Sequence, residues 1–464
     1  MHGTAMLDRP QSAPAPSEEP RQAGEPGRLL AAVFDTFDRA GISFCVLHGY
    51  EAFPHWPGSD VDCVVGSQVS RRRLIELLAR NAPALGAEVI RCKGSHIVLA
   101  SRGGEGARVF VTLDLSADCA LDDVCFYDGD ELLEGRRHQD CFWIPAAKQE
   151  FGCYLVQSVA KGRLDDDRTA RLGRLFCQDA AGCEEQVARF WDRPSAALIV
   201  AAAESGDWDP VRRRQPELQA ELRRRAFRKR PGRAIAGRLH GLLSRVGRLL
   251  RPDGVYVAVL GPDGAGKSSL IDALQERLAG AFAGSTCYGF TPGLIHRLRH
   301  GPYRENSAPH ELPPRSWPMS VARALGYWLP YYTLGYLVRH LDLARSRLVL
   351  SDRHFADVLV DPRRYRYGGP MWLVRLIWRL IPKPDLVVLL DAPPEVLQAR
   401  KQDVPFAETA RQRSAYLELV RSLPNGHVID AGQPPEQVAT DVSDIVHQHL
   451  AGRIERRFGA VRNA

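Results

Sequence analysis

The chain has 464 residues, enough for two to three domains, and its 45% hydrophobic and 25% charged residues are typical of globular proteins. Its ten cysteines form no CxxC pair, which argues against a zinc or disulfide scaffold and predicts free thiols in a reducing cytoplasm. The net charge of +7 is uneven, because residues 211–251 carry +12 and leave −5 for the rest. We expect a cytoplasmic protein without a signal segment, since the longest aromatic and apolar stretch, residues 324–338, is shorter than the roughly 20 residues of a membrane-spanning helix.

Residues 1–26 are rich in Pro, Ala, Ser and Glu without periodicity, and we expect a disordered tail. An amphipathic helix follows, then an apolar strand over residues 42–47 that leads to Gly49. A second strand carries Asp60 and Asp62, which share one face because side chains alternate along a strand. A later strand over residues 109–115 carries Asp114.

A glycine after the first strand, then Asp-x-Asp, then a later Asp resembles the nucleotidyltransferase superfamily over residues 27–145. The resemblance implies an α+β domain in which Asp60, Asp62 and Asp114 hold Mg²⁺ for nucleotidyl transfer. Tyr50 departs from it, because that family has Gly or Ser there to handle a triphosphate. Two alternatives stay open: a non-catalytic nucleotide-sensing module, or three ordinary turn and strand-end acids.

Residues 146–210 have helical periodicity and no catalytic pattern, so we expect a helical extension of the first domain. Residues 211–252 form a basic amphipathic linker, in which an apolar stripe along residues 233–251 is flanked by arginines. Docking of this helix on a neighbouring domain is the favoured interpretation, and contact with an anionic membrane is the second. Nucleic acid is a weaker third, because no recognition motif accompanies the charge.

A six-residue apolar run over residues 255–260 leads into the sequence GPDGAGKSS, which is followed by apolar residues at helical spacing. Strand, glycine-rich loop and helix in this order predict a nucleotide phosphate site. Backbone N–H groups of the loop would hold phosphates, Lys267 would reach the outer phosphates and the Ser268 hydroxyl would bind Mg²⁺. The predicted nucleotide-binding residues are Gly261, Asp263, Gly264, Ala265, Gly266, Lys267, Ser268 and Ser269.

Further strands are predicted over residues 285–290, 347–351, 385–390 and 426–429, separated by helical sequence. This alternation predicts an α/β fold with a parallel sheet covered on both faces, over residues 253–450, before a tail at 451–464. Ligands of such sheets lie at the carboxyl ends of the strands, where Asp263, Asp352, Arg353 and Asp391 are predicted to lie.

The motifs GPDGAGKSS, LVLSDRH, LLDAPPEVLQARK, RQRSAYLEL and HVIDAGQPPEQV resemble thymidylate kinase in order and spacing. The resemblance implies an ATP- and Mg²⁺-dependent P-loop kinase in which Asp263 holds the acceptor sugar and Arg353 grips the acceptor phosphate. Asp352 would order either the water shell of the metal or the surroundings of the acceptor phosphate. Gly264 stands where one class of the family has arginine, so Arg400 and Lys401, and after them Arg411 and Arg413, would supply that charge. Asp391 would either cap the next helix or bind a water molecule of the metal ion. Whether the kinase forms a homodimer stays open.

The acceptor side departs from this family. The expected run after the DRH motif is replaced by residues 360–369, which contain Arg363, Arg364 and Arg366, and the helix before the third strand has Tyr331 and Tyr332 in place of charged residues. The resemblance implies a nucleoside monophosphate such as dTMP, or another phosphorylated acceptor. Because several base-recognition groups are missing together, we expect dTMP itself to be a poor substrate, although the two tyrosines could stack on a pyrimidine.

Overall fold

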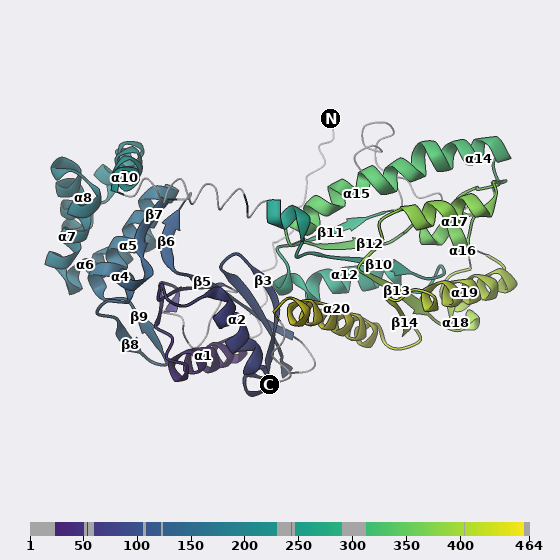
Figure 1. The fold of residues 1–464 in the computed structure, drawn as a ribbon, viewed down its shortest axis with the longest axis horizontal. Helices are drawn as coiled ribbons and strands as arrows, with labels where there is room; N and C mark the ends of the chain where they lie inside the picture. The colour runs from purple at the N-terminus through teal and green to yellow at the C-terminus, as the bar shows by residue number, and fades with distance from the viewer. Residues whose placement is uncertain are drawn as a thin grey trace, which may run out of the picture.

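The structure, a computed structural model, describes residues 24–50, 53, 60–104, 108–121, 124–229, 243, 246–289, 312–402 and 404–458. They form two α/β units, with the carboxyl-terminal helix α20 between their sheets (Figure 1). This confirms the α/β class and the parallel sheet of the second unit. Residues 1–23, most of the first expected tail, and residues 459–464, the end of the second, lie outside the described residues.

The first unit contains a mixed five-stranded sheet of order β1-β2-β5-β4-β3, in which only β2 and β5 are parallel. Helices α1 and α2 cover one face, where Phe34 and Leu74 share a core with Val61. The elements are α1 (Gly24–Arg39), β1 (Phe44–Val46), β2 (Asp60–Val65), α2 (Arg71–Arg80), α3 (Ala82–Leu85), β3 (Ala87–Lys93), β4 (His96–Arg102), β5 (Arg108–Ser116), β6 (Asp118–Leu121), β7 (Val124–Asp128), α4 (Gly129–Leu133), β8 (Arg137–Gln139) and β9 (Phe142–Ile144).

A helical extension packs against the other face of β1 and β2, where Val64 contacts the core that contains Phe151. Its helices are α5 (Ala147–Lys161), α6 (Asp166–Gln178), α7 (Ala180–Phe190), α8 (Arg193–Ser205), α9 (Asp209–Arg213) and α10 (Gln215–Lys229). The expected boundary at residue 210 was wrong, because Leu218 and Leu222 of α10 are fully buried in this core.

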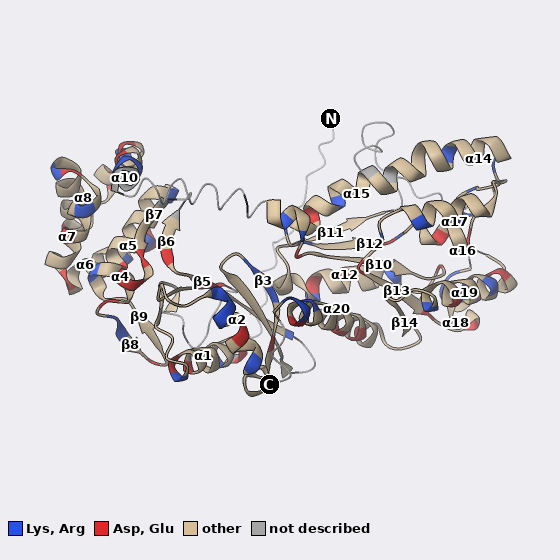
Figure 2. Cartoon of the chain, viewed as in Figure 1, with Lys and Arg blue, Asp and Glu red and all other residues tan. Residues whose placement is uncertain are grey.

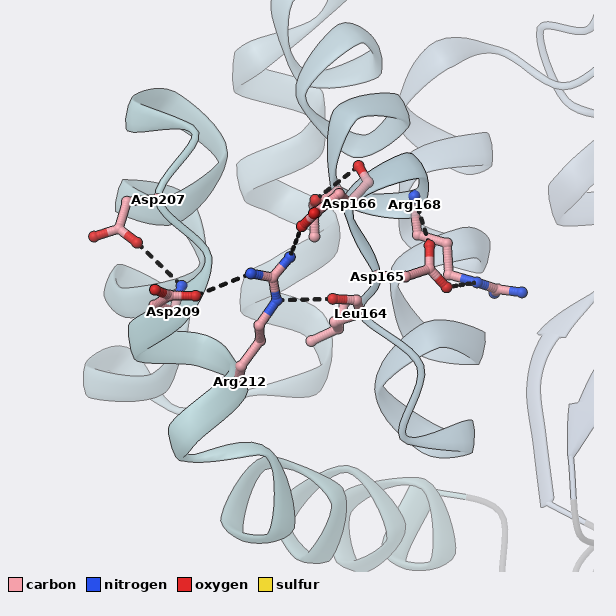
Figure 3. Close-up of polar contacts among 8 residues, drawn as sticks. Leu164, Asp165, Asp166, Arg168, Asp207, Asp209 and Arg212 are labelled. Carbon is pink, nitrogen blue, oxygen red and sulfur yellow. Dashed lines mark hydrogen bonds and ion pairs between the residues drawn. The ribbon is translucent and has the colours of Figure 1, made fainter. Parts of the chain in front are cut away.

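Arg212 shows why the basic sequence after residue 210 belongs to the extension (Figure 3). Its guanidinium donates to the Leu164 carbonyl at 2.8 Å, to Asp209 at 2.9 Å and to Asp166 at 2.6 Å. These hydrogen bonds to Asp209 and Asp166 raise the pKa of Arg212 above its ordinary value. One arginine thus joins α9 to the start of α6, so part of the basic charge has a structural role.

The second unit is a parallel sheet of order β11-β12-β10-β13-β14 with helices on both faces. Helices α12 and α20 pack on one face, whereas α15 and α19 pack on the other. The elements are β10 (Val255–Leu260), α12 (Lys267–Arg277), the 3₁₀ turn η3 (Ala279–Ala281), β11 (Ser285–Tyr288), α14 (Trp317–Arg323), the π-helical turn η4 (Ala324–Trp328), α15 (Leu329–Ala344), β12 (Leu348–Ser351), α16 (Ala356–Val360), α17 (Met371–Leu380), β13 (Leu386–Asp391), α18 (Pro394–Arg400), α19 (Phe406–Arg421), β14 (Gly426–Asp430) and α20 (Pro435–Phe458).

Helix α20 joins the two units. Ile90, Val98 and Ala100 of the first sheet share a core with α12 and α20, and Ile454 of α20 lies in the core of the first unit. Arg108 of β5 pairs with Asp444 of α20 at 2.6 Å. The expected end of the kinase domain at residue 450 was therefore too early, because α20 continues to Phe458 and Ile454 is buried in the core of the first unit.

Most of the segment predicted to contact a neighbouring domain or a membrane, residues 233–251, lies outside the described residues. Its described end, a helical turn at residues 246–250, contacts α15: His340 Nε2 is 2.5 Å from the Leu249 carbonyl oxygen. This contact agrees with docking on a neighbouring domain, and membrane contact stays a prediction. Within the described ranges, no helix is both long enough and apolar enough to cross a membrane.

Candidate functional site

The phosphate loop lies at the carboxyl end of β10, whose six residues are all buried. Lys267, the first residue of α12, folds back over the loop and donates from Nζ to the carbonyl oxygens of Gly261 at 2.8 Å and Pro262 at 3.0 Å. Burial lowers the pKa of Lys267, while the carboxylates of Asp263 and Asp357 oppose that shift. A half-buried ammonium therefore lies beneath the backbone N–H groups that would receive phosphates.

Asp263 of the loop forms an ion pair with Arg364, and each side chain is only 15% exposed. Burial alone would raise the pKa of Asp263, but the charges of Arg364 and Lys267 outweigh it and hold the pKa at about 2. The sequence indicated a cationic segment that contains Arg364, but nothing in it identified Arg364 as the partner of Asp263. The two residues are 101 positions apart and meet only in the folded chain.

Asp352 and Arg353 follow β12, the strand beside β10, as the sequence predicted. Burial opposes the charge of Arg353, but Tyr365, Asp263, Asp357 and Asp352 raise its pKa above the ordinary value. The guanidinium therefore stays charged in every usual buffer. The fold brings Lys267, Arg353 and Arg364 to one end of the sheet, where their charges act on the same carboxylate, Asp263.

A buried hydrogen-bond network supports this cationic group. Asp357 accepts hydrogen bonds from Tyr416 Oη at 2.8 Å and from the His354 backbone N–H at 2.8 Å. Asp361 accepts from the Arg364 backbone N–H at 3.1 Å and from Gln412 at 3.0 Å. These contacts fix residues 361–364 against α19 and so position Arg364.

His354, the third residue of the DRH motif, is 1% exposed and packs among the rings of Tyr256, Tyr332 and Trp378. Burial, with the charges of Arg339 and Lys383, lowers its pKa to about 3. His354 is thus a neutral packing residue. Tyr332 is 2% exposed in the same aromatic core, so the expectation that it could stack on a pyrimidine was wrong; the Tyr331 side chain lies outside what the structure describes.

The end of α18 packs directly on the phosphate loop. A Cβ added to Gly264 would lie 2.9 Å from the Leu397 carbonyl oxygen, 3.3 Å from Lys401 Cβ and 3.5 Å from Arg400 Cβ. Arg400 and Lys401 therefore lie beside Gly264, the loop position at which one class of the resembled family has arginine. Arg400 also donates to the Ala431 carbonyl at 3.0 Å.

The two other candidate arginines are engaged elsewhere. Arg413 forms a bidentate pair with Asp391, with distances of 2.7 and 2.9 Å, and Arg411 pairs with Glu408 at 2.6 Å. Asp391 therefore does not cap the next helix, whose N-cap is Pro393. Asp391 instead joins β13 to α19.

The residues predicted to hold Mg²⁺ with ATP are Ser268 and Asp352. Ser268 lies exposed in the first turn of α12, and Asp352 follows β12 at the same end of the sheet. A hydroxyl and a carboxylate beside phosphate oxygens suit a hard divalent cation that keeps several waters. They fit the ion, and their part in binding it stays a prediction.

In the first unit, β2 and β5 pair in parallel with Asp62 opposite Asp114, and both line a cavity of about 530 Å³. His48 Nε2 lies 2.7 Å from Asp62 and His96 Nε2 lies 3.5 Å from Asp114. The hydrogen bond from His48 lowers the pKa of Asp62 despite its burial. Asp60 lies exposed, opposite Thr112.

The predicted three-aspartate metal site is therefore only partly assembled. In the described parts of the chain, no group of three or more His, Cys, Asp or Glu residues could hold a metal ion. Tyr50 is a core residue whose hydroxyl donates to the buried Glu150 at 2.8 Å, and Glu150 pairs with Arg171 at 2.6 Å. Sequence reasoning missed His48 and His96, because nothing marks a lone histidine as the partner of a distant aspartate.

Comparisons with known proteins concern the kinase prediction. No family model matches the chain. The chain is 28% identical to the thymidylate kinase of Oenococcus oeni over 224 residues, which are 43% of this chain and 99% of that protein. It is 30% identical to a probable thymidylate kinase of Methanopyrus kandleri over 169 residues, 36% of this chain and 75% of that protein. A phosphonates import ATP-binding protein of Pseudomonas syringae is also 30% identical, over 33% of this chain and 60% of that protein.

Proposed function

We propose that this chain, which belongs to the thymidylate kinase family through its P-loop region, transfers the γ-phosphoryl group of ATP to a phosphorylated small molecule, with a nucleoside monophosphate as the first acceptor class. One observation carries the proposal: Lys267, Arg353 and Arg364 converge on Asp263 at the carboxyl ends of two neighbouring parallel strands. Three cations in a half-buried site suit a reaction between two anionic phosphates.

Each residue has a role that follows from its position. The backbone N–H groups of the loop and of the first turn of α12 receive the phosphates of ATP, and Lys267 exchanges its two carbonyl contacts for phosphate oxygens. Arg353, held charged by the surrounding carboxylates, grips the acceptor phosphate. Arg400 and Lys401, beside Gly264, neutralise the charge on the transferred group. Mg²⁺, held by Ser268 with a water shell ordered by Asp352, would supply further charge neutralisation.

A screen of nucleoside monophosphates with ATP tests the acceptor class, with ADP formation and the phosphorylated product both measured. We expect at least one monophosphate to be phosphorylated and dTMP to be a poor substrate. Losing a single polar contact to a base costs roughly 1–3 kcal/mol, or about 5- to 150-fold. Several such groups are replaced here, and Tyr332 is buried away from any ligand. Saturation by dTMP at micromolar concentration would contradict the expectation about dTMP but not the kinase itself.

A second candidate function concerns the cavity of the first unit, because Asp62 and Asp114 lie opposite each other on neighbouring strands that line it. The resemblance to nucleotidyltransferases makes a nucleotide the ligand to test. Since Asp62 is paired with His48 and Asp114 with His96, we infer nucleotide sensing without transfer.

Pyrophosphate release from nucleoside triphosphates separates the two alternatives. We expect none above the background of the Asp62→Asn variant. Asp35→Asn is the control, because Asp35 is a half-exposed residue of α1 paired with Arg39. Pyrophosphate release that is lost in Asp62→Asn and kept in Asp35→Asn would establish a nucleotidyltransferase instead.

A further inference from the structure

A second charged cavity lies where the two units meet, away from the phosphate loop. It has a volume of about 290 Å³ and is lined by β3, by residues 251–253 before β10 and by the last turns of α20. Five of its lining residues are arginines and one is an acid: Arg91, Arg251, Arg453, Arg456, Arg457 and Asp253. Figure 2 shows basic residues on β3, on α2 and at the end of α20 that faces the first sheet.

The positive charge of this cavity is not balanced by its own lining. Asp253 contributes one negative charge and lies 3.5 Å from Arg457. Burial raises the pKa of Cys92, which also lines the cavity, to about 12, so its thiol is neutral. The lining therefore has a formal charge of +4.

Among the described residues, two of these guanidinium groups donate hydrogen bonds to neutral acceptors. Arg453 donates to the carbonyl oxygens of Gly254 at 2.8 Å and of Pro252, and Arg91 donates to the Ser346 carbonyl at 3.4 Å. Carbonyl oxygens satisfy N–H groups without cancelling charge. Arg251 and Arg456 are exposed and form no ion pair with any residue that the structure describes.

Arg71 of α2 provides an independent observation. Its Nε and Nη2 atoms are buried and have no hydrogen-bond partner among the described residues. Burial lowers the pKa of Arg71, the charge of Arg457 lowers it further and the charge of Asp253 raises it, so Arg71 lies within electrostatic range of the cavity. Arg71 itself lines the neighbouring cavity of the first unit, so it adds positive charge behind the arginine-lined cavity without being part of its lining.

We propose that this arginine-lined cavity binds a multivalent phosphate anion, either free oligophosphate or the phosphate tail of a nucleotide. The planar guanidinium group binds phosphate oxygens in bidentate fashion, and five such groups from three segments surround one hollow. Because β3 belongs to the first unit and α20 to the second, a bound anion bridges the two units. Occupancy therefore stabilises their junction, as does any ligand that binds only the folded form.

The test uses calorimetric titration of inorganic pyrophosphate, without divalent cations, into the full chain with Lys267→Ala, which weakens anion binding at the phosphate loop. In that background, Arg251→Gln with Arg456→Gln removes two cavity charges that have no ion pair among the described residues. The matched control, Arg375→Gln with Arg379→Gln, removes two exposed arginines of α17. We expect pyrophosphate to bind the Lys267→Ala protein. Its affinity should fall at least about tenfold when the two cavity arginines are also changed, and it should stay the same in the control variant.

A repeat titration with ADP distinguishes the two sources of the phosphate. If the cavity takes the phosphate tail of a nucleotide, ADP should bind more tightly than pyrophosphate. If it takes free oligophosphate, ADP should not bind more tightly. The proposal also requires that pyrophosphate raise the melting temperature of the Lys267→Ala protein and not that of the cavity variant. Three results would overturn it: no pyrophosphate binding to the Lys267→Ala protein, equal affinity in the cavity variant, or an equal loss in the control.

Discussion

At the scale of single residues, the kinase site is an assembly of opposite charges shielded from water. Asp263 and Arg364 are each 15% exposed, so their attraction is screened less than that of a surface pair. The acid lies in a loop whose chemistry the sequence predicted, while its partner lies in a segment that the family pattern does not cover. Local sequence thus identified the loop, whereas the pair depends on how residues 361–364 pack against α19.

The depressed pKa of Asp263 predicts a defined pH dependence of stability. The pKa falls from an ordinary value of 3.8 to about 2 in the folded chain, so the unfolded chain binds the proton more tightly. The stabilisation is complete above pH 4 and is lost as pH falls toward 2, with a total of about 2 kcal/mol and about half of it gone at pH 3.

Urea unfolding at pH 6 and pH 3 measures this contribution. Between these two pH values, the free energy of unfolding of Asp263→Asn, whose side chain cannot titrate, should fall by about 1 kcal/mol less than that of the parent protein. Asp35→Asn serves as the control and should lose as much as the parent. An identical pH dependence in the parent and in Asp263→Asn would show that the carboxyl is not held by Arg364 and Lys267.

At the scale of elements, the close approach of α18 to the phosphate loop determines what can stand at position 264. Gly264 has φ = +85° and leaves no room for a side chain, because a Cβ would lie 2.9 Å from the Leu397 carbonyl oxygen. Under the proposed function, Arg400 and Lys401, which lie beside Gly264 at the end of α18, supply charge near the transferred group.

Gly264→Ala should destabilise the protein by about 1–2 kcal/mol, from the positive φ and the displaced α18, and should lower kcat more than it raises KM. Gly173→Ala is the matched control, since nothing lies within 4 Å of a Cβ at this position of α6. It should be neutral or stabilising by up to about 1 kcal/mol. Wild-type stability and kcat in Gly264→Ala would show that α18 does not pack on the loop as described.

The elements also show how far the sequence could predict the fold. All five strands of the parallel sheet were predicted, and the three central ones, β10, β12 and β13, are short and strongly apolar runs. Strand alternation predicted that Asp60 and Asp62 share a face, whereas the register that places Asp62 opposite Asp114 was not predicted. The burial of α10 could not be predicted, since Leu218 and Leu222 lie in a basic sequence whose composition resembles a solvated linker.

At the scale of the whole molecule, α20 makes the two units one structure. Its first turns cover the parallel sheet, and its last turns enter the core of the first unit through Ile454 (Figure 1). The arginine-lined cavity lies in this same junction. The sequence analysis assigned residues up to 450 to the kinase domain, but a helix that packs on two sheets has no sequence signal beyond its apolar faces.

The central claim is that the chain transfers a phosphoryl group from ATP at the loop that contains Lys267. The most direct measurement is acceptor phosphorylation by the full chain, with the phosphorylated product identified by mass spectrometry, in parallel for the parent, Lys267→Ala and Lys148→Ala. Lys148 is a surface residue of α5 paired with Glu185, so its removal should leave the activity unchanged. The account predicts that Lys267→Ala stays folded and forms at least about 100-fold less product, because losing a preorganised charge on the reacting phosphates costs about 3 kcal/mol or more. The account would be contradicted if folded Lys267→Ala formed as much product as the parent protein.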